Sequence, residues 1–349
     1  MAGFENFWGN SSVAATLSQM ISDSRIPQTI LLGGPEGVGK ATLVRRFAAQ
    51  LLGDAARIEQ DDLSSPGNLD LIEQREKLPA DKRAEDPLLF SSHPDFVTFP
   101  PDGPLRQLSI QQIRLVKERA QLKPMRGPWR IFLIDHLDRA NEQAANSLLK
   151  LLEEPPNHLI VFATAENLYD LLPTIRSRSV VLQLGRLNEN EMRDFIGAKG
   201  LPDLEARLSL AEGCPGLAVS HDLAKYRERR DLMLSFFECA AGAIPFSGWV
   251  EASESFSNRK TEKLDFYLQP AYSVLEDILL TWQGSQKVRN ADVRARVAQV
   301  SSRVNFRWIE AANRAVDEIA MLLRRNIQKI IALDAVIIDL RNQVPGASA

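Results

Sequence analysis

The chain has 349 residues, which suggests two or three domains at roughly 150 residues each. A net charge of −3 argues against a protein that chiefly coats phosphate backbones, and 25% charged residues argue against wholesale disorder. No apolar run approaches the roughly 18 residues that span a bilayer, and the start of the chain lacks the pattern of a signal peptide. Cys214 and Cys239 are too few for a disulfide framework or a four-thiolate zinc site. We therefore expect a cytoplasmic, multidomain protein without membrane contacts.

Short apolar runs alternate with helical patterns in the first half of the chain. The apolar runs predict strands at residues 29–32, 95–99, 130–135, 159–163 and 179–184. Apolar residues at helical spacing predict helices at residues 40–52, 110–121 and 141–154. Such alternation is typical of an α/β fold with a parallel, doubly wound sheet.

Other stretches have a different character. Residues 54–92 show little periodicity and predict an insertion or surface excursion, with a helix near residues 69–77. From about Leu223 onward the pattern is helical, with almost no strand-like run. We expect one long final helix whose apolar stripe must be covered by the chain's own helices or by a neighbouring subunit. The stripe consists of Trp308, Ala312, Val316, Ile319, Leu323, Ile327, Ile330 and Ile337.

A glycine-rich loop follows the first predicted strand. The phosphate-binding pattern G-x-x-x-x-G-K-[S/T] is nearly matched by residues 34–41, GPEGVGKA. Glycines let backbone N–H groups face phosphates, and Lys40 would neutralise phosphate charge. Ala41 stands where a hydroxyl normally holds Mg²⁺, and Thr42 comes one residue late, about 100° further around the helix. The loop predicts nucleotide binding with little metal-assisted chemistry; a plain glycine turn is the alternative.

The strand predicted at residues 130–135 ends in a carboxylate. It resembles a Walker B strand, whose Asp135 would help to hold a metal, although an aspartate there is also a common helix cap. In active ATPases of the extended-helicase-like class, the residue after the Walker B aspartate is usually a glutamate that polarises the attacking water. Here that residue is His136. His136 acting as a base is a weaker alternative, because an imidazole carries no metal-bridging charge.

A basic segment, residues 173–179, separates the last two predicted strands. Such a segment is usually a solvated surface. In this fold, however, the segment before the last strand meets a neighbouring subunit, where an arginine stabilises charge during phosphoryl transfer. Thr164, at the end of the preceding strand, is either a polar sensor of that phosphate or a hydroxyl in a turn.

Taken in chain order, these motifs resemble the clamp-loader branch of the AAA+ proteins. The stretches that match are Gly34 to Lys40, Ile131 to Asp135, NSLLKLLEEPP at 146–156, Phe162-Ala163-Thr164 and Ser177-Arg178-Ser179. The NSLLKLLEEPP stretch followed by LLPTIRSR at 171–178 is specific to that branch. Two further stretches, His93-Pro94-Asp95-Phe96 and Arg324-Arg325-Asn326 with Ile330 to Leu340, are similar to its bacterial members, above all to the delta-prime subunits of DNA polymerase III.

The resemblance implies an AAA+ P-loop core over residues 1–185, a helical lid over 186–221 and an all-α collar over 222–349. It implies that Arg178 is an arginine finger acting in trans on a neighbour's ATP, within a Ser-Arg-Ser version of the family's Ser-Arg-Cys motif. The implied nucleotide-binding residues are Gly34, Gly37, Gly39, Lys40, Thr42, Asp135 and Thr164.

Three departures from the family pattern concern catalysis. They are Ala41, His136 and Gly216, the last of which stands where motor subunits place a phosphate-sensing arginine. They predict a subunit without ATPase or polymerase activity of its own, and they leave open whether ATP or ADP binds and whether Mg²⁺ accompanies it. The 54–92 insertion lacks the four cysteines that bind zinc in many relatives, so we expect no zinc.

The resemblance also implies partners. These are the delta and gamma/tau subunits of the clamp loader, with the sliding clamp and primer–template DNA reached mainly through the complex. Two alternatives stand beside this interpretation. One is an active gamma/tau-like motor subunit, favoured by Lys40 and opposed by the three departures. The other is an unrelated AAA+ adaptor, opposed by the NSLLKLLEEPP helix and the long terminal helix.

Overall fold

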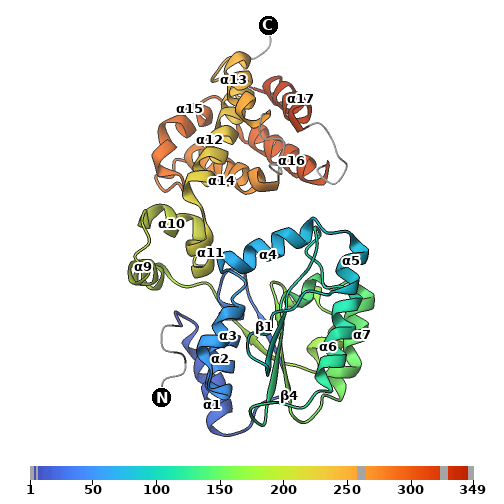
Figure 1. The fold of residues 1–349 in the computed structure, drawn as a ribbon. Coiled ribbons are helices and arrows are strands. Elements are labelled where there is room, and N and C mark those ends of the chain that lie inside the picture. Colours follow the sequence, from blue (N-terminus) through green and yellow to red (C-terminus); the bar gives the residue numbers. More distant parts are fainter. Residues whose placement is uncertain (1–3, 5–6, 258–264, 323–328, 345–349) are drawn as a thin grey trace. The chain divides into compact units, whose positions relative to one another are not determined.

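The computed structural model describes the chain except residues 1–3, 5–6, 258–264, 323–328 and 345–349 (Figure 1). Arg324, Arg325 and Asn326 therefore lie outside the described residues. The chain divides into two compact units, residues 1–204 with 211–220, and residues 205–210 with 221–349. The division into core, lid and collar stays a prediction. No helix in the described part of the chain is long and apolar enough to cross a membrane.

The first unit is built on a five-stranded parallel sheet. Its strands are β1 (Thr29–Gly33), β2 (Phe96–Phe99), β3 (Arg130–Ile134), β4 (Leu159–Ala165) and β5 (Val180–Gln183), arranged in the order β2-β3-β4-β1-β5. Every neighbouring pair is parallel. Parallel neighbours need crossover connections, which helices supply here. The predicted α/β fold with a parallel sheet, followed by a helical C-terminal region, is confirmed.

Alternating side chains of the central strands fill two separate cores. Ile131 and Leu133 of β3 pack on the side of α1 (Ser11–Ser22) and α2 (Lys40–Leu52). Phe132 and Ile134 pack on the opposite side, against α6 (Ile110–Ala120) and α7 (Glu142–Glu153). Figure 1 shows these helix layers on either side of the strands. Because both faces are covered, the strands are continuous apolar runs, which is why the sequence revealed them.

Capping residues fix where the flanking helices begin. Ser109 and Gln112 form a reciprocal capping box at the start of α6, and the Asn141 side chain accepts from the Ala144 N–H at the start of α7. Because its strands are all parallel, the sheet presents their carboxyl ends along one edge. In open parallel sheets that edge is where ligands bind.

The 54–92 insertion is more helical than its sequence suggested. It holds α3 (Ala55–Ile58), the 3₁₀ turn η1 (Glu59–Asp61), α4 (Pro66–Glu76) and α5 (Ala80–Glu85), of which only the helix at α4 was predicted. Arg75 of α4 anchors it through an ion pair with Asp102, 2.7 Å between Nη2 and Oδ2. The buried Asp61 carboxylate accepts the Ser92 N–H at 3.0 Å. Polar anchors of this kind leave no apolar periodicity in the sequence.

Short elements complete the first unit and lead into the second. They are η2 (Leu137–Arg139), η3 (Leu168–Asp170), α8 (Pro173–Arg176), α9 (Glu189–Ala198), α10 (Leu204–Ala211) and α11 (Pro215–Ser220).

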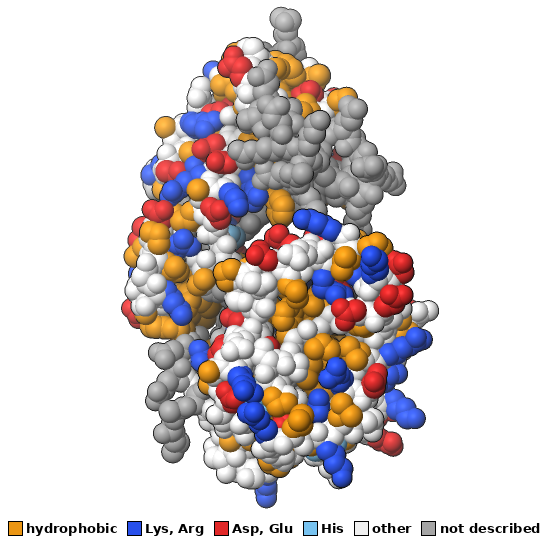
Figure 2. Space-filling view, in the orientation of Figure 1, with side chains coloured by type: hydrophobic (Ala, Val, Ile, Leu, Met, Phe, Trp, Pro, Cys, Tyr) orange, Lys and Arg blue, Asp and Glu red, His pale blue; other side chains and the backbone are white. Residues whose placement is uncertain are grey.

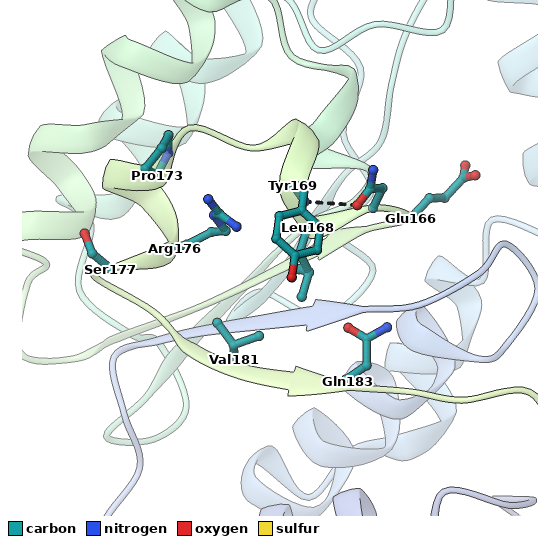
Figure 3. A pocket seen from close by; sticks show the side chains of 9 residues that line it. Glu166, Leu168, Tyr169, Pro173, Arg176, Ser177, Val181 and Gln183 are labelled. Atoms are coloured by element: carbon teal, nitrogen blue, oxygen red, sulfur yellow. Dashed lines mark hydrogen bonds between the residues drawn. The ribbon is translucent and has the colours of Figure 1, made fainter.

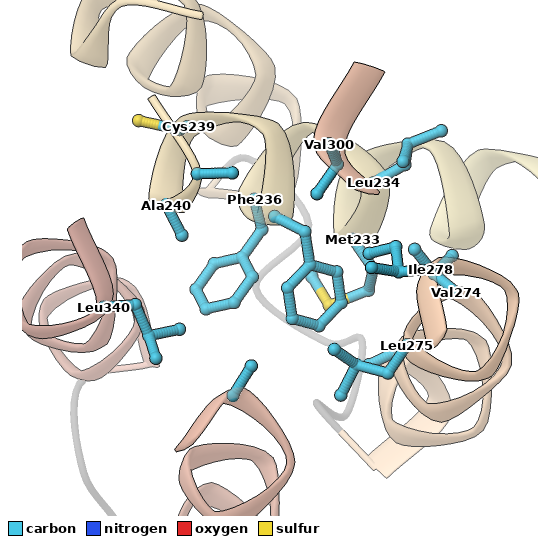
Figure 4. Packing of buried hydrophobic residues seen from close by; sticks show 14 of the residues in the cluster. Met233, Leu234, Phe236, Cys239, Ala240, Val274, Leu275, Ile278, Val300 and Leu340 are labelled. Atoms are coloured by element: carbon cyan, nitrogen blue, oxygen red, sulfur yellow. The ribbon is translucent and has the colours of Figure 1, made fainter. Parts of the chain in front are cut away.

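The described residues of the second unit form helices joined by turns, with no strand among them. Its elements are α12 (Leu223–Ala240), α13 (Phe246–Ser257), α14 (Asp265–Trp282), η4 (Ala291–Val293), α15 (Arg294–Ser301), α16 (Phe306–Leu322) and α17 (Lys329–Arg341). Figure 4 shows its core, in which Phe236 of α12 lies among side chains from several helices, including Val274, Val300 and Leu340.

The expectation of one long final helix is wrong. The indole N–H of Trp308 donates to the Leu340 carbonyl at 3.0 Å, although the two residues are 32 positions apart. In a continuous helix they would lie about 48 Å apart. The chain therefore reverses between α16 and α17, which pack on each other. Among the described members of the stripe, Trp308, Val316 and Ile337 are buried, so the unit's own helices cover them.

Candidate functional site

The glycine-rich loop of residues 34–39, called the P-loop below, joins β1 to α2 at the carboxyl edge of the sheet. Gly34, Gly37 and Gly39 all have positive φ, at 144°, 75° and 103°. Side chains are disfavoured in this region of backbone space, so the glycines give the loop its tight, inward-turned course. A Cβ on Gly34 would lie 2.6 Å from the Leu184 carbonyl oxygen. The conformation fits a loop whose backbone closely approaches a phosphate chain.

Lys40 opens α2 directly after the loop. Its side chain is 6% exposed, and Nζ donates to the carbonyl oxygens of Gly34 at 2.5 Å and Pro35 at 2.9 Å. Burial lowers the pKa of Lys40 from its ordinary value, while nearby carboxylates, Asp135 foremost, partly offset this. The ammonium group is thus held against the loop that would surround a phosphate.

The metal ligands expected beside such a loop are incomplete. The methyl group of Ala41 packs against the core on the α2 side of the sheet. The Thr42 hydroxyl accepts from Nη2 of Arg45 at 3.3 Å, within its own helix. Neither residue supplies the hydroxyl that normally holds Mg²⁺ at this position. The loop therefore fits a phosphate chain better than a complete Mg²⁺ site.

Asp135 and Thr164 are brought together at the ends of β3 and β4. The buried Thr164 hydroxyl donates to Oδ1 of Asp135 at 2.6 Å and accepts from the His136 N–H at 2.9 Å. Thr164 thereby connects two neighbouring strands. Its hydroxyl is engaged with these two groups rather than with the P-loop.

The segment that contains Gly216 lies directly on the P-loop. The Gly216 N–H donates to the Gly37 carbonyl at 2.7 Å. A Cβ at position 216 would lie 2.9 Å from that same oxygen, and one on Gly37 would lie 2.8 Å from Leu217. The close approach of α11 to the loop therefore needs glycine on both sides. No side chain, and hence no arginine, can stand at position 216 in this arrangement.

Arg178 lies in the turn between α8 and β5. Its side chain is 35% exposed and forms an ion pair with Glu153 at the end of α7, 2.7 Å between Nη2 and Oε1. Nη1 donates to the Thr174 carbonyl at 2.9 Å and to the Ser177 hydroxyl at 3.4 Å. None of these partners belongs to the chain's own P-loop.

An open pocket of about 730 Å³ borders Ser177 (Figure 3). Tyr169 is 83% exposed at its rim, and the Arg176 guanidinium lies 5.2 Å from the centre of its ring. Val181 of the edge strand β5 is also exposed. The other lining residues are Glu166, Asn167, Leu168, Pro173 and Gln183. This pocket contains no P-loop residue.

The sequence did not reveal several residues that contact Arg178 or the turn at His136 after β3. Glu153 pairs with Arg178, and Glu166, just beyond β4, lies 3.4 Å from Nδ1 of His136. Asp138, in the turn after β3, accepts the Glu166 N–H at 3.0 Å. The position of Glu166 directly after a predicted strand was a usable indication, because strand ends meet at one edge of a parallel sheet.

Comparison with known proteins bears on this architecture. The family described as DNA polymerase III, delta subunit, matches residues 9–188, just over half of the chain. The delta-prime subunit of Pseudomonas aeruginosa is 29% identical over 225 residues, 62% of each protein. The gamma/tau subunit of Mycobacterium tuberculosis (strain H37Rv) is 29% identical over 189 residues, 51% of this chain and 28% of the relative.

Solved structures give a weaker likeness. A gamma subunit-related protein of DNA polymerase III from Thermotoga maritima aligns with 95% of this chain and 99% of its own, at 20% identity and a TM-score of 0.44. The chain spans between about a quarter and two thirds of the length of the curated relatives named above. On the family match over residues 9–188, the chain belongs to the DNA polymerase III, delta subunit, family.

Proposed function

We propose that this chain is a delta-prime-type subunit of a DNA polymerase III clamp loader, one that does not hydrolyse ATP itself. In this proposal it inserts Arg178 into the ATP site of a neighbouring gamma/tau motor subunit while the sliding clamp is loaded onto primed DNA. The observation that carries the proposal is the placement of Arg178. Its guanidinium is partly exposed and bonded only to groups outside its own P-loop.

The chain's own P-loop supports the non-hydrolysing part of the proposal. Ala41 provides no hydroxyl for Mg²⁺, and His136 replaces the water-polarising carboxylate. Gly216 leaves no space for a second phosphate-contacting arginine, since α11 lies on the loop backbone. ATP or ADP bound at Lys40 would act as a structural ligand. Such a nucleotide would stabilise the fold by mass action without being consumed.

The arginine has a defined physical role in the neighbour's site. Negative charge spreads over the equatorial oxygens of a transferred phosphoryl group, and a planar guanidinium donates two parallel hydrogen bonds to them. Arg178 must leave Glu153 to do so. The pair is partly exposed, so its separation costs little.

The proposed partners follow from this role. Delta and gamma/tau subunits would flank the chain, and the clamp and DNA would be reached through the assembled complex. Figure 2 shows Lys and Arg side chains spread over one face without merging into a continuous patch, as suits a subunit with little direct grip on DNA.

The deciding experiment compares ATP hydrolysis by the reconstituted complex containing wild-type chain, Arg178→Ala or Arg178→Lys. The control is Arg193→Ala, which removes an exposed arginine paired with Glu189 on α9. A transition-state arginine is worth about 10³ or more at one site. We expect a partial loss of total hydrolysis for both Arg178 variants, because other sites keep their own arginines. An unchanged rate in a complex that still assembles would leave a purely structural subunit.

A gamma/tau-like motor is the second candidate, favoured by the intact lysine and glycines of residues 34–40 and by the gamma/tau relatives. Hydrolysis by the purified chain separates the two candidates. Turnover that disappears in Lys40→Ala would establish the motor, whereas turnover unaffected by Lys40→Ala would point to a contaminating ATPase.

A further inference from the structure

Three potential metal ligands converge beside the ends of β3 and β4. They are His136 and Asp138, on the turn after β3, and Glu166, directly after β4. One ligand atom of each lies within 4.8 Å of the others. Nδ1 of His136 is 3.4 Å from Oε1 of Glu166 and 3.9 Å from Oδ1 of Asp138. Ligand atoms about 2.0–2.1 Å from a tetrahedral zinc ion are about 3.3 Å apart. The His136–Glu166 pair already has this spacing, and Asp138 must move closer to both on binding.

Two of these atoms are buried without a partner. Nδ1 of His136 and Oδ1 of Asp138 are shielded from solvent and form no hydrogen bond. The Asp138 side chain is only 10% exposed, and its other oxygen is fixed by the Glu166 N–H at 3.0 Å. A buried carboxylate oxygen without a donor is costly unless a cation or a hydrogen bond compensates it. Both unpartnered atoms belong to the same cluster.

The surrounding residues suit a bound cation. Nε2 of His136, on the other side of the ring, is 4.0 Å from Oδ2 of Asp135. A carboxylate bonded to the second ring nitrogen is the usual outer partner of a metal-binding histidine, and Asp135 takes that role only if this distance shortens to hydrogen-bond length. Asp135 is itself fixed by the Thr164 hydroxyl. Arg139 pairs with Oε1 of Glu166 at 2.7 Å, so a metal ion must displace this guanidinium or bind the other Glu166 oxygen. The Lys40 ammonium is bonded to loop carbonyls.

We propose that His136, Asp138 and Glu166 bind one divalent first-row transition-metal ion, zinc above all, through one nitrogen and two carboxylate oxygens. The imidazole ligand favours zinc over magnesium, which prefers oxygen ligands alone. Neither position 41 nor Asp135, where a Mg²⁺–nucleotide complex would be held, supplies a ligand atom to the proposed site. The site also departs from the expectation of no zinc, which considered only cysteine ligands.

The test measures zinc bound to the tag-free full-length chain by equilibrium dialysis without nucleotide. Two variants remove one ligand each without straining the backbone. His136→Gly suits the backbone there, because residue 136 has a φ of 51°, and Asp138→Asn keeps an oxygen for the Glu166 N–H. The matched control is His158→Ala, which alters a histidine directly before the first residue of β4, at the end of the strand away from Glu166.

We expect one zinc ion per wild-type and His158→Ala chain, with affinity weakened about 100-fold or more in the two ligand variants. Even outer partners of metal ligands are worth about 10–100-fold. Binding of Co²⁺ should give tetrahedral-type visible absorption that zinc abolishes. Circular dichroism of the metal-free variants checks that they are folded. Zinc binding equal to wild type in folded His136→Gly, or displacement of zinc by equimolar Mg²⁺, would overturn the proposal.

Discussion

The guanidinium of Arg178 is joined to the carboxylate of Glu153 across 2.7 Å, connecting the turn before β5 to the end of α7. Both residues are partly exposed, at 35% and 45% of their side-chain surface. Glu153 begins the Glu153-Glu154-Pro155-Pro156 run, so two motifs noted separately in the sequence are in direct contact. The pair holds Arg178 in place and also competes with any phosphate that Arg178 would bind.

Replacement of Glu153 tests whether its ion pair chiefly positions Arg178 or chiefly competes with the phosphate that Arg178 would bind. Exposed ion pairs are worth about 0.2–1 kcal/mol, so Glu153→Gln should leave the stability of the chain nearly unchanged. We expect ATP hydrolysis by the assembled complex to rise by up to about fivefold at the affected site, because Arg178 no longer has to leave a carboxylate. A fall in the rate instead would show that Glu153 positions Arg178. Glu189→Gln, which alters the exposed pair with Arg193, is the control.

The contact between α11 and the P-loop predicts an asymmetry between two glycines. Gly216→Ala would place a Cβ 2.9 Å from the Gly37 carbonyl oxygen, which forces the two backbones apart. We expect a loss of about 1–3 kcal/mol in the free energy of unfolding of the first unit. Gly197→Ala in α9 meets no atom within 4 Å and should stabilise by up to about 1 kcal/mol. Urea denaturation measures both, and equal effects would contradict the close contact.

The sheet and its two cores could be predicted because their cause is local. Buried parallel strands are apolar throughout, and β1 to β5 each fall within two residues of their predicted bounds. The reversal between α16 and α17 could not be predicted, because an apolar stripe at helical spacing continues through residues 308–337 whether or not the chain turns back. The predicted motifs likewise placed the P-loop and Asp135 at one sheet edge. The partners Glu153 and Glu166 depend on contacts across 25 to 30 positions, which spacing alone does not reveal.

The reversal makes a prediction for the second unit. Trp308→Phe removes one of two N–H groups that donate to the Leu340 carbonyl, the other being the Gln343 N–H at 3.0 Å, so the loss is that of one hydrogen bond, about 0.5–1.5 kcal/mol. Trp282 is 44% exposed, so Trp282→Phe should change stability by less than about 0.5 kcal/mol. Denaturant unfolding followed by circular dichroism compares the two variants. Equal stability of both would mean that Leu340 does not depend on Trp308.

A buried histidine predicts how the stability of the first unit depends on pH. His93 is 1% exposed, and its Nδ1 accepts the Asp95 N–H at 3.1 Å, so the ring is neutral at that nitrogen. Burial lowers the pKa of His93 below its ordinary value of 6.5. Below pH 6.5 the unfolded chain therefore takes up a proton that the folded chain does not, and stability falls as the pH drops toward the lowered pKa.

The slope of this loss is at most about 1.4 kcal/mol per pH unit for one proton. His93→Asn keeps an acceptor for the Asp95 N–H but cannot be protonated in this range, so its stability should decline less between pH 7 and about pH 5. Urea titrations at a series of pH values give the difference between the two proteins. Parallel curves would show that His93 has the same pKa in the folded and unfolded chains. A steeper decline in His93→Asn would reverse the sign and mean that the folded protein stabilises the charged ring.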